Sequence, residues 1–396
     1  MTPPSNASKP TAARLLVVDD DVMNLDVLQR LLDAYGYVIA TAGNGREALA
    51  RLQQEPFDLV LLDITMPEMD GFTVLQTMKA DARLRELPVI LISGLEDMDS
   101  IARCIEIGAD DYLPKPFKPV LLRARIGSCL EKKQLREQEQ ATYRALVESQ
   151  KHLAEELAEA EKYVRSLLPE PLTGKVQTEW RFITSTSLGG DSFGYYWLDD
   201  DHLAMYLLDV CGHGVGAALL SISAMNVLRS QSLSGTDFKN PGAVLSALNE
   251  AFQMDRQNNM YFTMWYGVYN AVTRQIVFAR GGHPPAVLLT GASRETAQPV
   301  ELKAPGMVIG SMPGLKYRTV TVDLGAFSEL YLFSDGVYEV TLPDGTMWEF
   351  NDFVTSLIRP PPPGKSELDL VMDVARKLQG RDTFDDDFSM VKFVFP

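Results

Sequence analysis

The segment Leu15-Leu16-Val17-Val18-Asp19-Asp20-Asp21 joins a short apolar run to three consecutive carboxylates. Amphipathic stretches separate it from four further apolar runs: Tyr37–Ala40, Leu59–Leu62, Val89–Ile92 and Asp111–Leu113. Alternation of apolar runs with helical patterns predicts a five-stranded parallel sheet with helices between the strands. The first part of the chain is therefore expected to be an α/β doubly wound domain over residues 14–127.

The carboxyl ends of parallel strands meet at one edge of a sheet, where such folds bind their ligands. Polar residues stand at these ends after four of the five runs: Asp19, Asp20, Asp63, Ser93 and Lys115. Taken singly, Asp20 or Asp21 could merely cap a helix, and Lys115 could be solvated. Their joint position favours a site made of carboxylates, a hydroxyl and a lysine.

The residue types at this edge suit transfer of a phosphoryl group to a carboxylate. Asp63 would act as the nucleophile, while Asp19 and Asp20 hold a hard cation such as Mg²⁺ that neutralises the phosphoryl oxygens. Lys115 would bring a mobile positive charge to the same oxygens.

Four motifs carry these residues: Val-Val-Asp-Asp-Asp at 17–21, Leu-Leu-Asp-Ile-Thr-Met-Pro-Glu-Met-Asp-Gly at 61–71, Leu-Ile-Ser-Gly at 91–94 and Tyr-Leu-Pro-Lys-Pro-Phe at 112–117. Together they resemble the receiver domain of two-component response regulators over nearly all of residues 14–127. The resemblance implies that Asp63 is the phosphoacceptor and that Asp19 and Asp20 bind Mg²⁺, with a backbone carbonyl from the region of Ile64 or Thr65.

The same resemblance implies a switch set of Ser93, Tyr112 and Lys115 that responds to the new phosphate. Ser93 would hydrogen-bond to the phosphate, and Tyr112 would repack behind it. A sensor histidine kinase is the implied phosphodonor.

Residues 120–168 are rich in Glu, Gln, Lys, Arg, Ala and Leu and contain no proline, which predicts a long helix that Pro169 and Pro171 end. A heptad fits its later part, with Tyr143, Gln150, Leu157 and Val164 at position a and Leu146, Leu153, Ala160 and Leu167 at position d. We expect residues 128–168 to be a coiled-coil linker that joins two parallel chains in a homodimer. The alternative is a solitary, solvated helix.

Strand-like runs dominate beyond Thr178: Leu203–Leu208, Phe262–Tyr269, Gln275–Phe278, Ala286–Leu289, Leu330–Phe333 and Met390–Phe395. Amphipathic helices are expected after Gly214, after Pro241 and over Glu367–Leu378. The pattern favours mostly antiparallel β structure with helices interspersed.

Acidic residues recur beside glycine or just before the last strand: Gly189-Gly190-Asp191, Asp209-Val210-Cys211-Gly212-His213-Gly214, Ser334-Asp335-Gly336 and Asp385-Asp386-Asp387-Phe388-Ser389. Glycine lets the backbone approach a metal closely, and several carboxylates can hold two ions that activate water for attack on phosphorus. Oxygen ligands favour Mg²⁺ or Mn²⁺, while four histidines and three cysteines offer little for zinc. Many Asp-Gly pairs are only surface turns, which is what we expect of Asp344-Gly345.

These motifs, together with Ser-Leu-Leu-Pro at 166–169 and Gly-Gly-His-Pro-Pro-Ala at 281–286, resemble the PPM family of serine/threonine protein phosphatases, in its SpoIIE/RsbU-like branch. The resemblance implies an α+β phosphatase domain over residues 169–396, with two packed antiparallel sheets flanked by helices. It also implies two Mn²⁺ or Mg²⁺ ions held by these groups: Asp191, Asp209 as the bridging ligand, the Val210 carbonyl, Asp335 and Asp386.

Four further residues bear on this assignment. Asp387 is the less favoured neighbour of Asp386. His213 is either a general acid toward the leaving oxygen or a loop-packing residue, and His283 is expected to hold a turn. Many relatives have a second Asp where this chain has Gly194, so metal affinity or substrate contact is expected to differ.

The two domains together predict a response regulator whose output is metal-dependent protein phosphatase activity, controlled by phosphorylation of Asp63. The resemblance implies a phosphorylated STAS-domain anti-anti-sigma factor as the substrate. The alternative is a catalytically weak pseudophosphatase that acts as a phosphorylation-controlled binding module.

The composition argues against other classes of protein. The chain has 37 basic and 53 acidic residues, a net charge of −16, and no basic helix-turn-helix pattern, so neither nucleic acid nor membrane is an expected partner. Three cysteines fit a cytoplasmic protein better than a disulfide scaffold. Residues 1–13 are expected to be a disordered tail, with no signal peptide and no run long enough to span a membrane.

Overall fold

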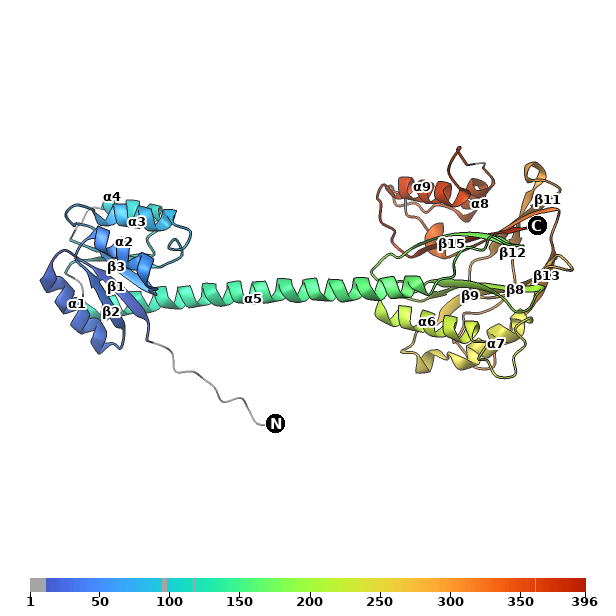
Figure 1. Cartoon of the computed structure of the whole chain (residues 1–396), viewed down its shortest axis with the longest axis horizontal. Coiled ribbons are helices and arrows are strands. Elements are labelled where there is room, and N and C mark those ends of the chain that lie inside the picture. The colour runs from blue at the N-terminus through green and yellow to red at the C-terminus, as the bar shows by residue number, and fades with distance from the viewer. Residues whose placement is uncertain (1–11, 95–97, 117, 360) are drawn as a thin grey trace. The chain divides into compact units, whose positions relative to one another are not determined.

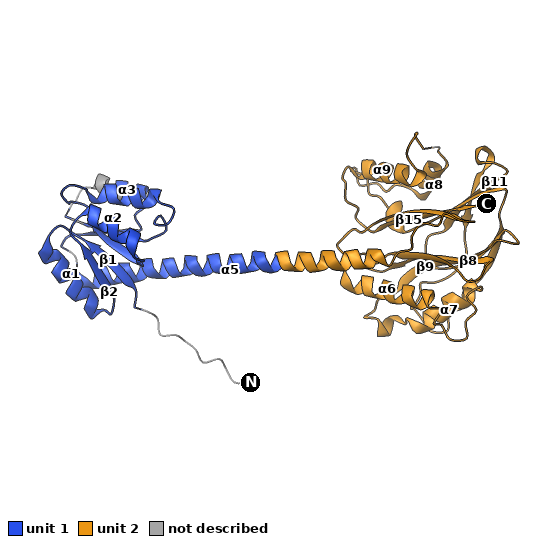
Figure 2. Ribbon diagram, in the orientation of Figure 1, with its two compact units in different colours: residues 1–150 blue, residues 151–396 orange. Residues whose placement is uncertain are grey.

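The computed structural model describes residues 12–94, 98–116, 118–359 and 361–396. The chain forms two compact units, residues 1–150 and 151–396, which Figure 2 colours separately. Each unit has its own sheets and its own hydrophobic clusters. Within the described parts, no helix is both long and apolar enough to cross a bilayer.

The first unit is built on a parallel sheet with the strand order β2-β1-β3-β4-β5 (Figure 1). Its strands are β1 (Arg14–Val18), β2 (Val38–Ala42), β3 (Leu59–Asp63), β4 (Val89–Ser93) and β5 (Asp111–Pro114). Its helices are α1 (Val22–Ala34), α2 (Gly45–Gln54), α3 (Gly71–Ala80), α4 (Met98–Ile107) and the first part of α5 (Pro119–Ser166). The five apolar runs are the five strands, which confirms the predicted doubly wound domain.

Helices cover both faces of this sheet because the strands are apolar on both sides. On one face Leu62 belongs to the same buried cluster as Val74 of α3. On the other face Leu61 clusters with Leu32 of α1 and Ile126 of α5. The edge formed by the carboxyl ends of the strands is left open for polar residues.

Helix α5 confirms the predicted long helix and begins at Pro119, a residue suited to the first helical turn. Its first turns bury Leu122, Ile126 and Cys129 against the sheet of the first unit. Further along, the heptad residues Tyr143 and Leu153 are 68% and 57% exposed in the single chain. The coiled coil itself stays a prediction.

The second unit contains two five-stranded sheets in which every pair of neighbouring strands is antiparallel. The first, in the order β13-β10-β9-β8-β7, consists of β13 (Val320–Asp323), β10 (Gln275–Gly281), β9 (Phe262–Asn270), β8 (His202–Val210) and β7 (Ser192–Trp197). The second, in the order β12-β11-β14-β15-β6, consists of β12 (Gln298–Leu302), β11 (Ala286–Gly291), β14 (Phe327–Phe333), β15 (Phe388–Phe395) and β6 (Gln177–Ile183). The helices are α6 (Val215–Arg229), α7 (Pro241–Ala251), α8 (Phe350–Ile358) and α9 (Glu367–Gln379), with short 3₁₀ turns at Met254–Arg256, Arg294–Thr296 and Asp335–Val337.

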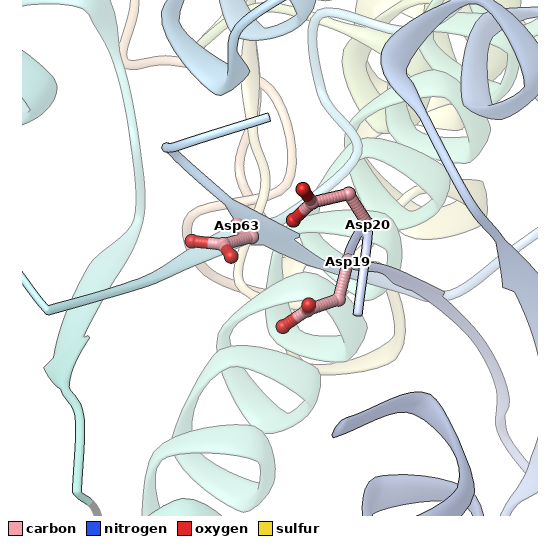
Figure 3. A group of neighbouring side chains, drawn as sticks. All are labelled: Asp19, Asp20 and Asp63. Carbon is pink, nitrogen blue, oxygen red and sulfur yellow. The ribbon is translucent and has the colours of Figure 1, made fainter. Parts of the chain in front are cut away.

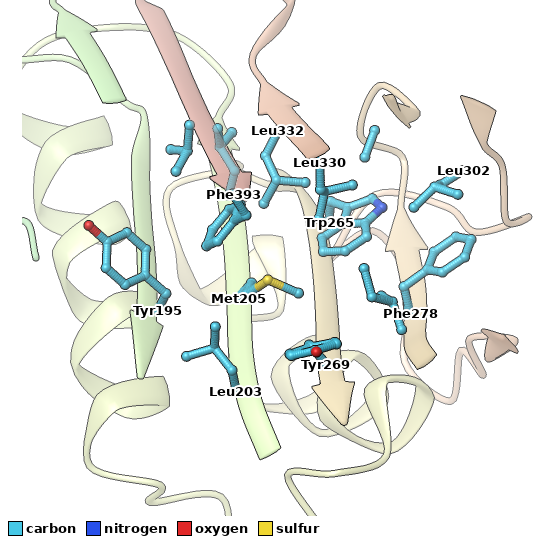
Figure 4. Packing of buried hydrophobic residues seen from close by; sticks show 14 of the residues in the cluster. Tyr195, Leu203, Met205, Trp265, Tyr269, Phe278, Leu302, Leu330, Leu332 and Phe393 are labelled. Atoms are coloured by element: carbon cyan, nitrogen blue, oxygen red, sulfur yellow. The ribbon is translucent and has the colours of Figure 1, made fainter. Parts of the chain in front are cut away.

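The main core lies between the two sheets, as Figure 4 shows. Trp265 and Phe278 stack with ring centroids 5.6 Å apart, and Leu330 and Phe393 from the other sheet belong to the same cluster. A second cluster joins α6 and α7 to the outer face of the first sheet, and a third joins α8 and α9 to the second sheet. This layering confirms the predicted pair of packed antiparallel sheets flanked by helices.

The sequence patterns located six strands of the second unit and missed four. The six located strands are β8, β9, β10, β11, β14 and β15, all inside their sheets, whereas β6, β7, β12 and β13 all lie at sheet edges. Edge strands pair on one side only and have less uniformly apolar sequences, as in Val-Thr-Val-Asp of β13. Helix α8 was also missed.

A buried ionic network ties α9 to the second sheet. Lys392 Nζ of β15 lies 3.0 Å from Glu329 Oε1 of β14 and 3.0 Å from Glu367 Oε2 at the start of α9. Arg294 pairs with the same two glutamates from the outside. The lysine side chain is only 9% exposed, so its charge is compensated within the protein rather than by water.

The variant Lys392→Met should destabilise the second unit by about 3 to 5 kcal/mol, because it leaves two buried carboxylates short of one partner. Denaturant unfolding of the full chain would measure this change. The exposed pair Lys303 and Glu301 supplies the control, since Lys303→Met should change the free energy of unfolding by no more than about 0.5 kcal/mol. Equal effects of the two variants would contradict the network's role.

Candidate metal centres

Three carboxylates meet at the open edge of the first unit's sheet (Figure 3). Asp19 and Asp20 follow β1, Asp63 ends β3, and one oxygen from each lies within 4.8 Å of the other two. Asp19 and Asp63 are buried, at 2% and 6% exposure, whereas Asp20 is exposed. Oxygen donors at this spacing fit a single Mg²⁺ ion.

Lys115 follows β5 and reaches the same point. Its Nζ lies 2.7 Å from Asp19 Oδ2 and 2.7 Å from Asp63 Oδ2. Burial raises the pKa of Asp63, and Lys115 opposes that rise. Burial works against the charge of Lys115, but its bonds to the two carboxylates raise its pKa overall. One lysine thus balances part of the negative charge and leaves the rest for a divalent cation.

Local contacts fix the position of these carboxylates. Asp21 caps α1 by accepting a backbone N–H of its first turn at 2.8 Å, so the helix-cap interpretation applies to this residue. Asn24, which no motif indicated, donates through Nδ2 to both oxygens of Asp19 at 3.2 Å. Gly71 starts α3 so close to the strand end that a Cβ would lie 2.3 Å from the Asp63 carbonyl oxygen. Only glycine fits there.

The remaining switch residues of the first unit are placed only in part. Ser93 ends β4, but its side chain lies outside the described residues. Tyr112 in β5 is half-buried and packs against the hydrophobic cluster to which α2 and α3 contribute. Their roles therefore stay predictions.

A pocket of about 280 Å³ in the second unit lies where strands of both sheets end. Its lining includes five of the residues that the sequence motifs predicted: Asp209, Val210, His213, Asp335 and Asp386. The remaining lining consists of Ser185, Cys211, Gly212, Tyr261, Thr263 and Asp385. No sequence motif indicated Ser185, Tyr261 or Thr263, because they reach the pocket through strand pairing and loop packing.

Asp191 precedes β7 and lies beside this pocket. It is 2% exposed, and neither carboxylate oxygen has a partner in normal hydrogen-bond geometry among the described residues, although the side chains of Ser389 and Ser334 act to lower its pKa. Burial raises its pKa well above the usual value, and the charge of Asp209 adds to the rise. A buried carboxylate with two orphaned oxygens fits a metal ligand, since a cation would satisfy both oxygens.

The other carboxylates repel one another in the same way. Burial raises the pKa of Asp209 to about 7, with further contributions from Asp335 and Asp386. Burial likewise raises the pKa of Asp335 to about 6, and Asp386 again adds to it. Within the described residues, Arg381 pairs with Asp385, but no ion pair reaches Asp191, Asp209, Asp335 or Asp386. The negative charge of these four carboxylates is therefore not compensated by any described basic side chain.

The chemistry of the donors indicates which cations fit. All four side chains offer oxygen, the ligand type that Mg²⁺ and Mn²⁺ prefer. Among the described acidic, histidine and cysteine residues, the triad of the first unit is the one group within 4.8 Å. The second unit's carboxylates form no such group of three at this spacing among the described residues.

Asp387 differs from Asp386 in its surroundings. Its carboxylate accepts hydrogen bonds from Ser185 N at 2.8 Å and Gly190 N at 2.7 Å. A Cβ at Gly189 would lie 2.2 Å from Asp387 Oδ2, so the Gly-Gly pair is required for this close approach. Asp387 therefore anchors the loop that carries Asp191.

Gly194 faces away from the pocket. It lies directly opposite Tyr206 in the β7–β8 pairing, and a Cβ there would be 2.4 Å from the Tyr206 hydroxyl oxygen. Tyr206 packs in the cluster shared with α6, whereas Phe193 points into the core between the sheets. An Asp side chain at this position would collide with Tyr206, so glycine at 194 fits the tyrosine that lies opposite it.

His213 is exposed at the pocket, on the loop between β8 and α6. The flanking Gly212 and Gly214 have φ values of +88° and +89°, which an L side chain rarely adopts. His213 therefore lies at the pocket on a turn that its two flanking glycines make possible. His283 is buried next to Thr263 rather than on the pocket surface.

Known proteins match the two units separately. Residues 15–127 match the model of the response regulator receiver domain, and residues 199–395 match that of stage II sporulation protein E. The chain is 39% identical over 122 residues to the "probable transcriptional regulator ycf27" of Guillardia theta, and 43% identical over 117 residues to the response regulator PleD of Caulobacter vibrioides. These matches span 31% and 30% of this chain, but only 47% and 26% of the relatives.

Among solved structures, the SiaA-PP2C domain of Pseudomonas aeruginosa has a TM-score of 0.53 and is 21% identical. The alignment covers 63% of this chain and 99% of that domain, which shows a shared fold. The chain therefore carries two known domains, a response-regulator receiver domain at residues 15–127 and a SpoIIE-type phosphatase domain with the PP2C fold at residues 199–395.

Proposed function

We propose that the chain is a response regulator whose output is metal-dependent dephosphorylation of protein serine or threonine, controlled by phosphorylation of Asp63. One observation carries the proposal: the half-buried Asp209 and Asp335 and the exposed Asp386 line one pocket, the buried Asp191 adds its charge to that of Asp209, and none has a compensating cation among the described residues. Such a cluster is unfavourable unless it binds metal ions. Its oxygen ligands fit Mg²⁺ or Mn²⁺.

In the receiver domain, Asp63 is the nucleophile toward the phosphoryl group of a sensor histidine kinase. Asp19 and Asp20 would hold Mg²⁺, which when bound neutralises the phosphoryl oxygens. The ammonium of Lys115, already 2.7 Å from Asp63, is placed to follow one phosphoryl oxygen when the carboxylate is converted to an acyl phosphate. Ser93 and Tyr112 would transmit the change as switch residues.

In the phosphatase domain, Asp209 is the proposed bridging ligand, aided by the Val210 carbonyl and by Asp191, Asp335 and Asp386. Two bound ions supply activated water and neutralise charge on the phosphate. A pocket of about 280 Å³ has room for a phosphorylated side chain but not for a folded protein. His213, exposed at the pocket, is placed to give a proton to the departing seryl or threonyl oxygen.

The partners follow from the same proposal. The substrate is a phosphorylated STAS-domain protein, so the chain would act in partner-switching signalling in the cytoplasm. Two copies would associate through α5, because its heptad residues Tyr143, Leu146 and Leu153 are more than half exposed in the single chain. A second helix would cover these side chains.

Phosphate release from a phosphoserine peptide in Mn²⁺ tests the enzyme. Asp209→Asn should lower turnover by more than about 100-fold, because mutation of a residue that only hydrogen-bonds to a metal ligand already costs roughly 10- to 100-fold. A chelator should abolish turnover in the wild type. Asp344→Asn is the matched control, since Asp344 is an exposed turn residue, and should leave turnover unchanged. Tight phosphopeptide binding without turnover in any metal would favour the pseudophosphatase instead.

Phosphorylation of the receiver domain tests the control. Acetyl phosphate with Mg²⁺ should label the wild type, and Asp63→Asn should take up no label because the nucleophilic oxygen is gone. The peptide phosphatase rate should change at least about twofold on labelling, in the wild type alone. Glu86→Gln, at an exposed position of the same domain, is the control and should behave as wild type. Labelling without any change in rate would refute the regulatory link.

The metal-free protein has a predicted pH dependence. Folded Asp209 and Asp335 keep protons up to pH about 7 and about 6, whereas the unfolded chain loses them near pH 3.8. The free energy of unfolding should therefore fall as pH rises from about 4 to 8, because unfolding releases these protons. In EDTA at pH 8, Asp209→Asn should raise the melting temperature by at least about 2 °C, and this gain should shrink toward pH 5.

Calorimetry of the full chain would follow the transition of the second unit across this pH range. Adding Mn²⁺ should reverse the order at pH 8, since only the wild type keeps all its metal ligands. If Asp209→Asn is less stable than the wild type in EDTA at pH 8, repulsion among the carboxylates does not destabilise the metal-free protein.

A further inference from the structure

The motif Gly281-Gly282-His283 begins at the last residue of β10 and supplies no ligand to the proposed metal centre. Its glycines are needed for packing: a Cβ at Gly281 would lie 2.7 Å from Ile309 Cδ1, and Gly282 has a φ of +72°. The bend that they form places His283 against Thr263 of β9. The imidazole is 2% exposed, so the protein rather than water decides its hydrogen bonds.

Thr263 connects this histidine to the pocket. Its Oγ1 lies 2.8 Å from His283 Nδ1. Thr263 also stands directly opposite Asp209 in the β8–β9 pairing, and both residues line the pocket. Directly paired residues of antiparallel strands place their side chains on the same face. Thr263 therefore neighbours both the buried imidazole of His283 and Asp209.

The protonation state of His283 follows from its surroundings. Burial lowers its pKa to about 3, while the backbone of Phe333 acts in the opposite direction, so the ring is neutral near pH 7. Nε2 is buried and has no partner in normal hydrogen-bond geometry among the described residues. A neutral imidazole carries one N–H, and when that proton is on Nε2, Nδ1 accepts the hydroxyl proton of Thr263.

We propose that His283 is a positioning residue: as the neutral Nε2–H tautomer, it holds the hydroxyl proton of Thr263 on Nδ1, so that Thr263 offers an oxygen lone pair to the pocket beside Asp209. A group that presents only a lone pair accepts a hydrogen bond from water and disfavours a phosphate oxygen at that point. Thr263 therefore orients a water molecule of the pocket for attack on the phosphoryl group. This inference rests on the proposed phosphatase function.

The arrangement also connects the two sheets. Thr263 lies in the sheet that carries Asp209, and Phe333 ends the strand that leads to Asp335. The ring of His283 is bonded to Thr263 and lies near the backbone of Phe333. A histidine that only held a turn would not need a pocket-lining hydroxyl as its partner.

Nitrogen-15 NMR of the imidazoles in the full-length, metal-free protein tests the tautomer without any need for activity. The chain has four histidines, and the spectrum of His283→Gln assigns the signal of His283. We expect a neutral Nε2–H ring that does not titrate between pH 5 and 8, and whose Nδ1 signal shifts in Thr263→Val. An Nδ1–H tautomer would turn the threonine proton toward the pocket and would overturn the inference.

Kinetics with a phosphoserine peptide in Mn²⁺ test the consequence. Thr263→Val should lower kcat about 10- to 100-fold, with KM and calorimetric Mn²⁺ affinity within about threefold of wild type, while Thr263→Ser keeps most of the rate. His283→Gln should cause a similar loss, and the double variant should be no worse than either single variant, because the two residues act as one unit. Thr290→Val is the matched control. Thr290 and its hydrogen-bond partner Ser328 both lie in the second sheet, so removal of this hydroxyl should not change the rate.

The outcomes separate this inference from the proposed function. Losses that add in the double variant and accompany weaker Mn²⁺ binding would make His283 a structural residue and overturn the inference. If the wild type itself shows no turnover, the proposed function fails, and the NMR result still decides the state of the His283–Thr263 pair.

Discussion

Mutual repulsion among carboxylates is the constraint on which the second domain depends. Asp191, Asp209, Asp335 and Asp386 come from four segments spread over about half of the chain, and none has a cationic partner among the described residues. Two sheets packed through a dense aromatic core hold these segments in place against that repulsion. The stability of the core is what allows the site to keep charges that only metal ions can satisfy.

The two domains solve the same electrostatic problem differently. In the receiver, Lys115 is bonded to Asp19 and Asp63, so part of the charge is balanced before any metal arrives. A single ion then completes the site. In the second domain Asp209 and Asp335 have raised pKa values instead, and their mutual repulsion is expected to appear as pH-dependent stability of the metal-free protein. Under the proposed function, the receiver lysine would move to a new phosphate, whereas the second site would keep its cations through each turnover.

Residues that are not proposed metal ligands set the geometry of the acidic site in the second domain. Gly189 and Gly190 let the loop carrying Asp191 close onto Asp387, whose oxygens accept its backbone N–H groups. The pairing of β8 with β9 places Thr263 opposite Asp209, and the bend before His283 brings an imidazole to that threonine. These contacts explain why glycine and histidine motifs accompany the acidic ones.

The sequence by itself determined both fold classes, the long helix, the six interior strands of the second domain and nearly all of the acidic groups, because apolar periodicity and carboxylates at strand ends are local features. Only the tertiary structure decided the four edge strands, the anchoring role of Asp387, the fit between Gly194 and Tyr206 and the approach of Thr263 to Asp209. Each of these depends on which strand lies next to which. That choice is made by packing between residues far apart in the chain, so no local pattern records it.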